Sequence, residues 1–184
     1  MVNRTRSRRT AVAALVLLPS CVVCSWPQGA FQLTVQTLEG TRFSIPGDLS
    51  AAVNILVIGF TRKAGAAARP WTERLERDFP VSRGFAVYPV AVLAGVPALF
   101  RAFALAATRS DSAPLERSRT LVALSDEAAW KKLAGFQEPD DPCVVVLDRA
   151  GSVLVRAQGT FQEPGYEAAS AAIRAAQEGK AWTN

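Results

Sequence analysis

The sequence predicts an α/β protein in which a mixed β-sheet is flanked by helices, with a β-hairpin at its N-terminal side. Three observations support this fold class. Residues 53–60 (VNILVIGF) form a continuous apolar run, which is typical of a strand buried on both faces. Strand-like and helix-like segments then alternate three times, which indicates parallel strands joined by right-handed crossovers. A second hairpin and a closing helix complete the order hairpin, β, α, β, α, β, α, β, β, α.

The first elements are a hairpin and the buried strand. Residues 31–46 (FQLTVQTLEGTRFSIP) alternate apolar and polar side chains around Glu39-Gly40, which predicts an antiparallel pair. The strand at 53–60 follows this pair.

A helix is predicted after the buried strand. Its apolar stripe recurs at every fourth position, at Trp71, Leu75 and Phe79. Pro70 is expected in its first turn and Pro80 at its end, because proline suits the start of a helix and cannot continue one.

Two further segments show the same alternation of strand and helix. Residues 85–93 (FAVYPVAVL) predict a second buried strand, which Pro89 should confine to the residues after it because proline removes a ladder donor. Residues 96–109 (VPALFRAFALAATR) predict a helix that is apolar around most of its circumference. Such a helix is either covered by the following polar loop and the N-terminal hairpin, or it contacts a partner.

The last third of the chain has the clearest pattern. Residues 119–126 predict a strand, and Asp126 is expected to cap a short helix that stops at Gly135. Residues 143–159 (CVVVLDRAGSVLVRAQG) predict two strands joined by a turn. Residues 164–179 predict a closing helix with Tyr166, Ala169 and Ile173 on one face and Gly179 as its stop.

Residues 1–25 predict an export signal, and residues 26–184 the folded domain. A basic stretch precedes an apolar run from Ala11 to Cys24, which is shorter than the roughly 20 residues that span a bilayer. Leu18-Pro19-Ser20-Cys21 approximates a bacterial lipoprotein signal with Cys21 as the lipidated residue, while simple cleavage after Ser25 explains the segment equally well. The expected location is the periplasm or the outer side of the bacterial inner membrane, with or without a lipid anchor that associates the N-terminus with the membrane.

Charge and composition exclude several classes of function. The chain has 21 basic and 16 acidic residues, and the signal contains four arginines and no acid, so 17 against 16 leaves a mature net charge of +1. This balance gives no reason to expect nucleic acid as a partner. Histidine is absent, which excludes His-dependent nucleophile systems and most zinc sites. The Asp140-Asp141 pair before Pro142 indicates a turn. No catalytic residue, metal or cofactor is therefore predicted.

Cysteine usage is equally restrictive. Cys21 and Cys24 lie inside the predicted signal, so Cys143 is the single cysteine of the body and cannot form an intramolecular disulfide there. We expect Cys143 to be a small core residue at the start of a buried strand.

The chain resembles the thioredoxin-like superfamily, in the branch of peroxiredoxins and periplasmic thiol-disulfide proteins. The resemblance rests on the succession of elements, on the loop GFTRKAGAAARPW (59–71) and on the segment DPCVVVLDRAG. The resemblance covers roughly residues 31–178. In that family a strand ends in Phe, and two redox cysteines follow five and eight residues later; counting from Phe60, these positions fall on Gly65 and Ala68. Because dithiol chemistry needs a thiolate and a resolving thiol, the resemblance implies a member without the usual redox activity.

A fainter resemblance links GFTRKAG, Trp71, VYPVAVL and LVALSDEAAWKKL to cysteine-less proteins related to the mitochondrial ATP synthase assembly factors. That resemblance implies a helper or chaperone role on a membrane complex. The predicted function is an exported, redox-inactive binding or chaperone module that holds an extended peptide of a protein partner. The alternative is a monothiol oxidoreductase or peroxidase-like enzyme that uses Cys143.

The candidate binding residues lie around this loop and the segment that faces it in the family. Arg62 and Lys63 can hold an anionic group beside a helix N-terminus, or they are simply solvated. Pro142 matches the family's cis-proline, and the resemblance favours a cis bond over an ordinary trans turn. Trp71 is expected in the core. The full set is Arg62, Lys63, Gly65, Ala68, Trp71, Pro142 and Cys143.

Overall fold

The computed structural model describes residues 31–181, so the predicted export signal at 1–25 and the candidate lipidation site Cys21 lie outside the described residues. The order of elements is the predicted one. The elements are β1 (Leu33–Thr37), β2 (Arg42–Ile45), β3 (Val53–Gly59), α1 (Arg62–Asp78), η1 (Val81–Arg83), β4 (Phe85–Val92), α2 (Ala98–Asp111), η2 (Pro114–Glu116), β5 (Leu121–Ala123), α3 (Glu127–Ala134), β6 (Cys143–Asp148), β7 (Val153–Gln158) and α4 (Glu163–Ala181).

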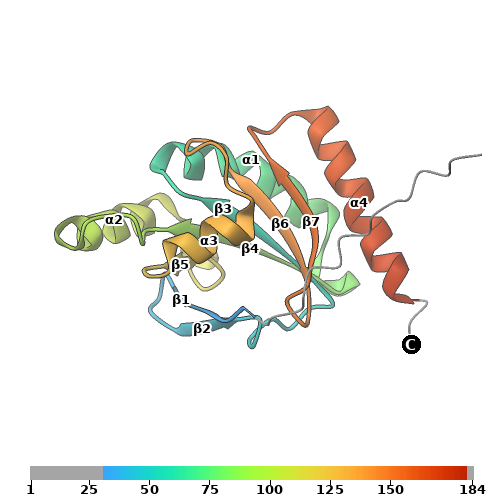
Figure 1. The fold of residues 1–184 in the computed structure, drawn as a ribbon, viewed down its shortest axis with the longest axis horizontal. Helices are drawn as coiled ribbons and strands as arrows, with labels where there is room; N and C mark the ends of the chain where they lie inside the picture. Colours follow the sequence, from blue (N-terminus) through green and yellow to red (C-terminus); the bar gives the residue numbers. More distant parts are fainter. Residues whose placement is uncertain (1–30, 182–184) are drawn as a thin grey trace, which may run out of the picture.

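A mixed sheet forms the centre of the molecule (Figure 1). Its seven strands in the described part of the chain lie in the order β2-β1-β5-β4-β3-β6-β7. The neighbours β3, β4 and β5 are parallel, and every other pair is antiparallel. The first two strand-helix alternations thus give parallel neighbours as predicted, whereas the third leads from β5 to the far side of β3, where β6 runs antiparallel.

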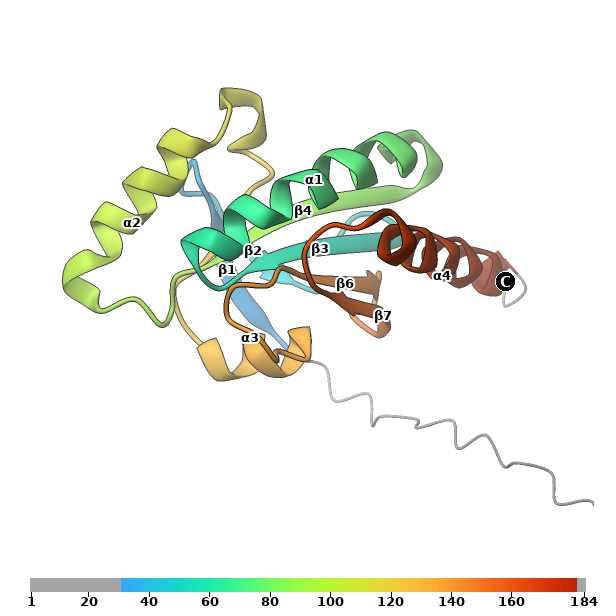
Figure 2. The same ribbon diagram turned by 90° about the horizontal axis from the view of Figure 1, so that it is seen from above.

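Helices cover both faces of the sheet, as seen from above in Figure 2. On one face, Trp71 and Leu75 of α1 and Ile173 of α4 pack against β3, β4 and β6. On the other face, Trp130 and Leu133 of α3 pack against the same strands and the hairpin. The continuous apolar run of β3 is explained by these two layers, since all seven of its residues are buried.

Helix α1 begins eight residues earlier than the sequence pattern predicts, at Arg62 instead of near Pro70. The segment between them is rich in alanine, which has the highest helix propensity, and the Thr61 side chain caps the new start. Pro70 therefore lies inside the helix, where its missing N–H leaves one carbonyl of the preceding turn without its usual donor.

Strand β4 also differs from the prediction, because it runs straight through Pro89. Pro89 is in register with Val57 of β3, while pairing with β5 starts only at Val90. One side of β4 has no ladder partner at Pro89, so the missing donor is tolerated there.

Two smaller predictions about helix ends were wrong. Asp126 occupies the position before α3 in a left-handed conformation (φ 59°), but its carboxylate accepts a hydrogen bond from Ser125 and makes no capping bond. Gly135 ends α3 as predicted, with a φ of 66°. Helix α4 continues past Gly179 to Ala181, since a glycine near a helix end lowers helix propensity without stopping the helix.

Helix α2 protrudes at one end of the molecule (Figure 1). None of its residues is buried, and Leu99, Phe100 and Phe103 are 84%, 57% and 76% exposed. The alternative in which the polar loop and the hairpin cover this helix is therefore wrong for these three side chains. Among residues 31–181 no helix combines the length and hydropathy needed to cross a bilayer.

Candidate functional site

The N-terminus of α1 is closed by a side-chain network. The Thr61 hydroxyl accepts a hydrogen bond from the Ala64 amide (3.0 Å) and donates one to an Asp140 carboxylate oxygen (2.9 Å). The Lys63 ammonium donates to the other oxygen of Asp140 (3.2 Å). These two hydrogen bonds, first that of Thr61 and then that of Lys63, lower the pKa of Asp140. A carboxylate of the chain itself thus faces the positive end of the helix dipole.

The positions that correspond to redox cysteines in the resembling family lie inside α1. Gly65 is exposed and Ala68 is buried. Gly65 approaches the end of β3 so closely that a Cβ on Gly59 would lie 2.9 Å from the Gly65 nitrogen. A Cβ on Gly65, by contrast, would meet no atom within 4 Å. The start of α1 therefore offers no thiol, and it has open space above Gly65.

The two candidate cations each have a carboxylate partner in the chain. Arg62 pairs with Asp111 at the end of α2 (3.7 Å), and Lys63 pairs with Asp140 (3.2 Å). The Arg62 and Lys63 side chains are 85% and 78% exposed, so both pairs are weak. An anionic group of a partner would have to displace or join these carboxylates, and such binding stays a prediction.

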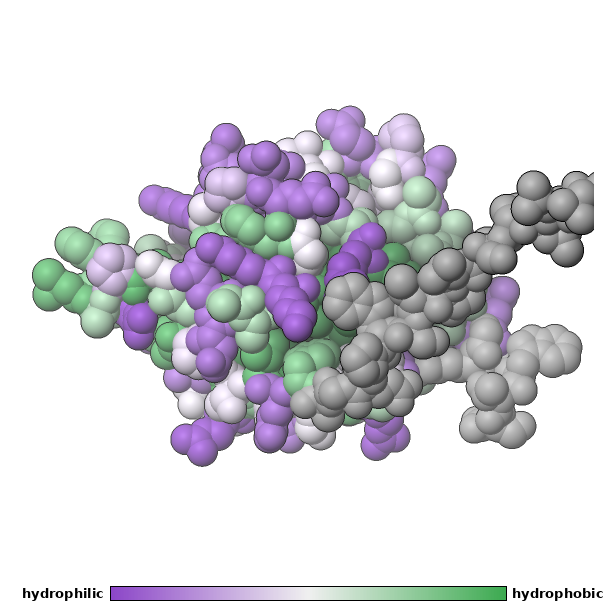
Figure 3. All heavy atoms as spheres, viewed as in Figure 1, coloured by the Kyte–Doolittle hydropathy of each residue, from purple (hydrophilic) through white to green (hydrophobic). Residues whose placement is uncertain are grey.

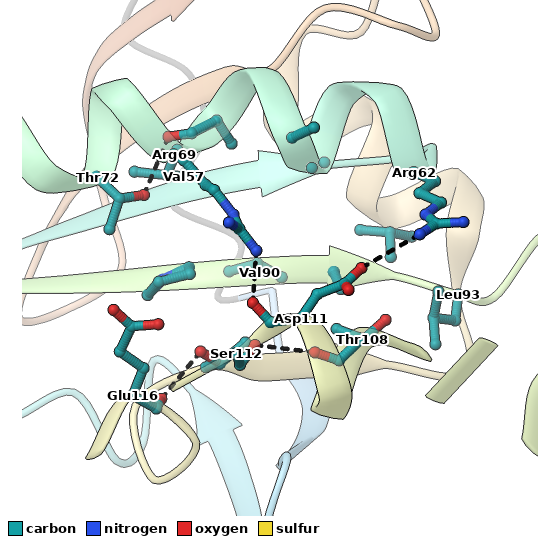
Figure 4. A pocket seen from close by; sticks show the side chains of 18 of the residues that line it. Val57, Arg62, Arg69, Thr72, Val90, Leu93, Thr108, Asp111, Ser112 and Glu116 are labelled. Atoms are coloured by element: carbon teal, nitrogen blue, oxygen red, sulfur yellow. Dashed lines mark hydrogen bonds and ion pairs between the residues drawn. The ribbon is translucent and has the colours of Figure 1, made fainter. Parts of the chain in front are cut away.

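A groove of about 780 Å³ lies between α1 and α2 (Figure 4). Its floor is formed by β3 and β4, including Pro89 and Ala91. Figure 4 shows Arg69 of α1 reaching across to Asp111, whose backbone oxygen accepts its hydrogen bond, with Arg62 on the other side of Asp111. Of the candidate residues, Arg62, Gly65 and Ala68 line this groove.

The two walls of the groove differ in chemistry. The α2 wall is mostly apolar, while the α1 wall is charged and polar with a gap at Gly65. The α2 wall comprises Phe103, Ala104, Ala107, Thr108 and Asp111, with Val96 just before the helix, and the α1 wall comprises Arg62, Gly65, Ala66, Arg69, Thr72, Glu73 and Glu76.

Trp71 belongs to the core and does not line the groove. It is 2% exposed, and its indole N–H donates to the Gly159 carbonyl at 3.0 Å. Its ring makes an edge contact with Phe161 at 5.5 Å between centroids and lies near Tyr166. Trp71 therefore joins α1 to the segment between β7 and α4, as expected for a structural residue.

Pro142 and Cys143 do not line the groove either. Among the described residues the Ile45–Pro46 bond is cis, and the bond before Pro142 is trans. The expectation of a cis Pro142 was wrong; it came from the resemblance alone, and trans is the favoured isomer of an ordinary X–Pro bond. Cys143 begins β6 and is completely buried. Burial, and then the charge of Asp141, raise the pKa of the Cys143 thiol to about 11.

Comparison with solved structures identifies the fold. The exposed lipoprotein thioredoxin of Streptococcus pneumoniae is similar over 74% of this chain and 95% of its own, with a TM-score of 0.54 and 12% identity. The fold is thioredoxin-like. A putative thiol:disulfide interchange protein, DsbE, from Chlorobium tepidum shares it with a TM-score of 0.54 and 21% identity over 80% of this chain and 94% of its own.

A third solved structure with the thioredoxin-like fold is BsSco, a member of the Sco family of cytochrome c oxidase assembly proteins. It matches over 80% of this chain and 93% of its own, with a TM-score of 0.52 and 14% identity. No protein-family model matches the sequence, and the curated proteins gave no significant match. The predicted fold class is thus confirmed, and the similarity at these identities concerns the thioredoxin-like fold alone.

Sequence reasoning missed two acids that shape the site. Asp140 lies in a turn, as predicted, and its carboxylate also accepts a hydrogen bond from Thr61 at the start of α1. Asp111 bridges α2 to Arg62 and Arg69. Thr61 and Asp140 are 79 residues apart in the sequence, so no local sequence pattern could predict their contact. Within residues 31–181 no cluster of His, Cys, Asp or Glu side chains is placed to hold a metal ion.

Proposed function

We propose that this chain is an exported, redox-inactive thioredoxin-like domain that acts as a binding or chaperone/assembly module at the outer side of the bacterial inner membrane. The observation that carries the proposal is the groove between α1 and α2, which opens beside the helix start where the resembling family has its thiols. Here the two corresponding positions are Gly65 and Ala68. The similarity of BsSco, from a family of assembly proteins, is consistent with such a role.

The groove suits an extended peptide of a protein partner. Its volume of about 780 Å³ falls within the range of roughly 300 to 1,000 Å³ that is common for ligand sites. An extended chain alternates its side chains between two sides. Apolar side chains on one side can pack against Phe103 and Ala107, while polar groups on the other meet Arg69 and Glu73.

The chemistry of Cys143 speaks against a monothiol enzyme. The nucleophile in thiol chemistry is the thiolate, and a thiol with a pKa of about 11 has only about one thiolate in ten thousand molecules at pH 7. Cys143 is also completely buried and does not line the groove. The Cys143 sulfur donates to the Asp141 carbonyl at 4.0 Å, and the nearby Asp141 charge raises the pKa of the thiol instead of activating it.

Peptide binding by the groove can be tested with an array of random decapeptides. We expect the full chain to bind a subset with alternating apolar residues, and Gly65→Leu to lose at least about tenfold in affinity because the new side chain enters the groove. Val81→Leu is the matched control, since Val81 is exposed on η1 and does not line the groove. A wild-type chain that binds no peptide, or a Gly65→Leu variant that binds as well as wild type, would contradict this function.

The location is tested separately, by the intact mass of the exported product. Cleavage after Ser25 gives a chain that starts at Trp26, and lipidation gives one that starts at a modified Cys21. A product that keeps Met1 and stays in the cytoplasm would contradict the export part of the proposal.

A further inference from the structure

The groove between α1 and α2 changes in character along its length. Hydrophobic side chains gather at the protruding end of the molecule, where α2 lies (Figure 3), and Phe103 brings this apolar surface to the groove. Toward η2, which follows α2, three carboxylates line the groove, two from later turns of α1 and one from η2. They are Glu73, Glu76 and Glu116, and Figure 4 shows the Glu116 side chain pointing toward α1. We refer to these three residues as the acidic end of the groove.

The acidic end carries more negative than positive charge. Glu76 pairs with Arg119 at 3.0 Å. Glu116 accepts a hydrogen bond from the Ala113 amide at 3.3 Å, and this partner is neutral. Among the described residues, neither Glu73 nor Glu116 forms an ion pair. Three carboxylates therefore share one guanidinium.

The other arginines near the groove have partners elsewhere. Arg69 lies one turn before Glu73, but its guanidinium reaches across the groove to the backbone carbonyl of Asp111. Arg62 pairs with the carboxylate of Asp111. Arg117 donates to a backbone carbonyl and does not line the groove. These side chains therefore leave the negative charge of the acidic end in place.

The three carboxylates influence one another. Burial is the main cause that raises the pKa of Glu76; the charge of Arg119 lowers it, and the charges of Glu116 and Glu73 raise it. Holding like charges close together disfavours their ionised forms unless a cation joins them. Arrangements of this kind occur preferentially at functional sites.

The acidic end suits an organic cation. Within residues 31–181 the carboxylates are not placed to hold a metal ion. A lysine or arginine side chain combines a terminal positive charge with an apolar stem. The stem can lie on the floor of the groove at Val57 and Pro89, while the charge reaches Glu73 and Glu116.

We propose that the acidic end of the groove binds a lysine or arginine side chain of the bound peptide. This inference rests on the proposed peptide binding and adds the kind of side chain that the groove selects. The apolar side chains of the peptide pack toward α2, and the basic side chain lies on the opposite side, toward Glu73. An acidic residue at the same position is disfavoured, because it adds a fourth carboxylate.

The first experiment measures the selection with defined peptides. The probes are decapeptides of alternating leucine and serine, in which each serine in turn is replaced by lysine, glutamine or glutamate. At one or two neighbouring serine positions, the full chain should bind the lysine peptide about tenfold more tightly than the glutamate peptide, with the glutamine peptide between them.

The second experiment assigns the selection to the acidic end. Glu73→Gln/Glu116→Gln removes both unpaired carboxylates, and it should bind the lysine and glutamate peptides with equal affinity. It should melt no lower than wild type, because both side chains are exposed and two like charges beside Glu76 are removed. The matched control, Glu39→Gln/Glu178→Gln, changes the net charge equally at exposed positions that do not line the groove, and it should keep the preference for lysine.

The possible failures are distinguishable. Equal binding of the lysine and glutamate peptides by the wild-type chain, or tighter binding of the glutamate peptide, would overturn this inference and leave peptide binding intact. A preference for lysine that survives in Glu73→Gln/Glu116→Gln, or that is lost equally in the control, would overturn it as well. If no decapeptide bound at all, the proposed function itself would fail.

Discussion

The hydroxyl of Thr61 donates a hydrogen bond to Asp140 at 2.9 Å and at the same time accepts one from the Ala64 amide at 3.0 Å. One side chain therefore caps α1 and joins it to the segment before β6. The carboxylate of Asp140 faces the helix end that would otherwise stabilise a thiolate. A carboxylate at this position would raise the pKa of any thiol placed at the start of α1, which supports the proposed redox-inactive role.

The Asp140 link predicts a pH-dependent stability. Because the pKa of Asp140 is lowered in the folded chain, its contribution is present above the ordinary carboxyl pKa of about 3.9 and is lost as the pH falls through the folded value. Asp140→Asn should melt below wild type near neutral pH, and the difference in melting temperature should shrink as the pH falls below the ordinary carboxyl range. Asp141→Asn is the control. A difference that persists at low pH would show that the carboxylate charge is not responsible.

The two glycines beside the groove should respond in opposite directions to alanine. Gly65→Ala should stabilise the chain by about 0.5 to 1 kcal/mol, because the position is helical and a Cβ there meets no atom within 4 Å. Gly59→Ala should destabilise it by about 1 to 3 kcal/mol, because the Cβ would lie 2.9 Å from the Gly65 nitrogen. Urea denaturation measures both values. Equal effects of the two substitutions would mean that this contact is described wrongly.

Tyr166 should make stability fall at alkaline pH. Tyr166 of α4 is buried in the protein core, and its hydroxyl donates a hydrogen bond to the Asp78 carboxylate at 2.7 Å. Burial, and then this hydrogen bond, raise the pKa of Tyr166 above the ordinary value near 10. A raised pKa means that the contribution is complete below about pH 10 and is lost as the pH rises further. Tyr166→Phe should lose about 1 to 2 kcal/mol near neutral pH and show a smaller alkaline decline. Denaturation curves at increasing pH provide the measurement.

Cys143 should react slowly in the folded chain. Its thiol is completely buried and its pKa is raised to about 11, so alkylation by iodoacetamide near neutral pH should be much slower than in urea. Peptide mass spectrometry separates its labelling from that of Cys21 and Cys24. Rapid labelling of Cys143 without denaturant would indicate an activated thiol and favour the enzymatic alternative.

The sequence predicted the fold where the pattern was local. The apolar run of β3, the hairpin at Glu39-Gly40 and the stripe Tyr166, Ala169, Ile173 of α4 all predicted elements that the structure contains. The predicted start of α1 was late because proline usually marks the first turn of a helix, whereas here the alanine-rich segment before Pro70 is already helical. The prediction that β4 begins after Pro89 was wrong. Proline is tolerated there because β4 is paired on only one side at Pro89, and this depends on the order of strands in the sheet, which a local pattern does not reveal.

The candidate site was harder to predict for the same reason. Gly65 and Ala68 were predicted from their spacing after Phe60, and both line the groove. The wall of the groove opposite α1 is formed by α2, which no spacing in the sequence indicates. The exposed state of Phe103 could be suspected from an all-round apolar helix, yet only the position of α2 relative to the sheet decides it. Contacts such as those of Asp111 and Asp140 depend on residues far apart in the chain.

The central claim, that this thioredoxin-like domain does not perform thiol-disulfide chemistry, is tested most directly by insulin reduction with dithiothreitol. The account predicts the same rate with and without the full chain, and no change on Cys143→Ser. A Cys21→Ser/Cys24→Ser variant measures any contribution of the N-terminal cysteines separately. Turnover above the uncatalysed rate that survives in this variant and disappears on Cys143→Ser would contradict the account.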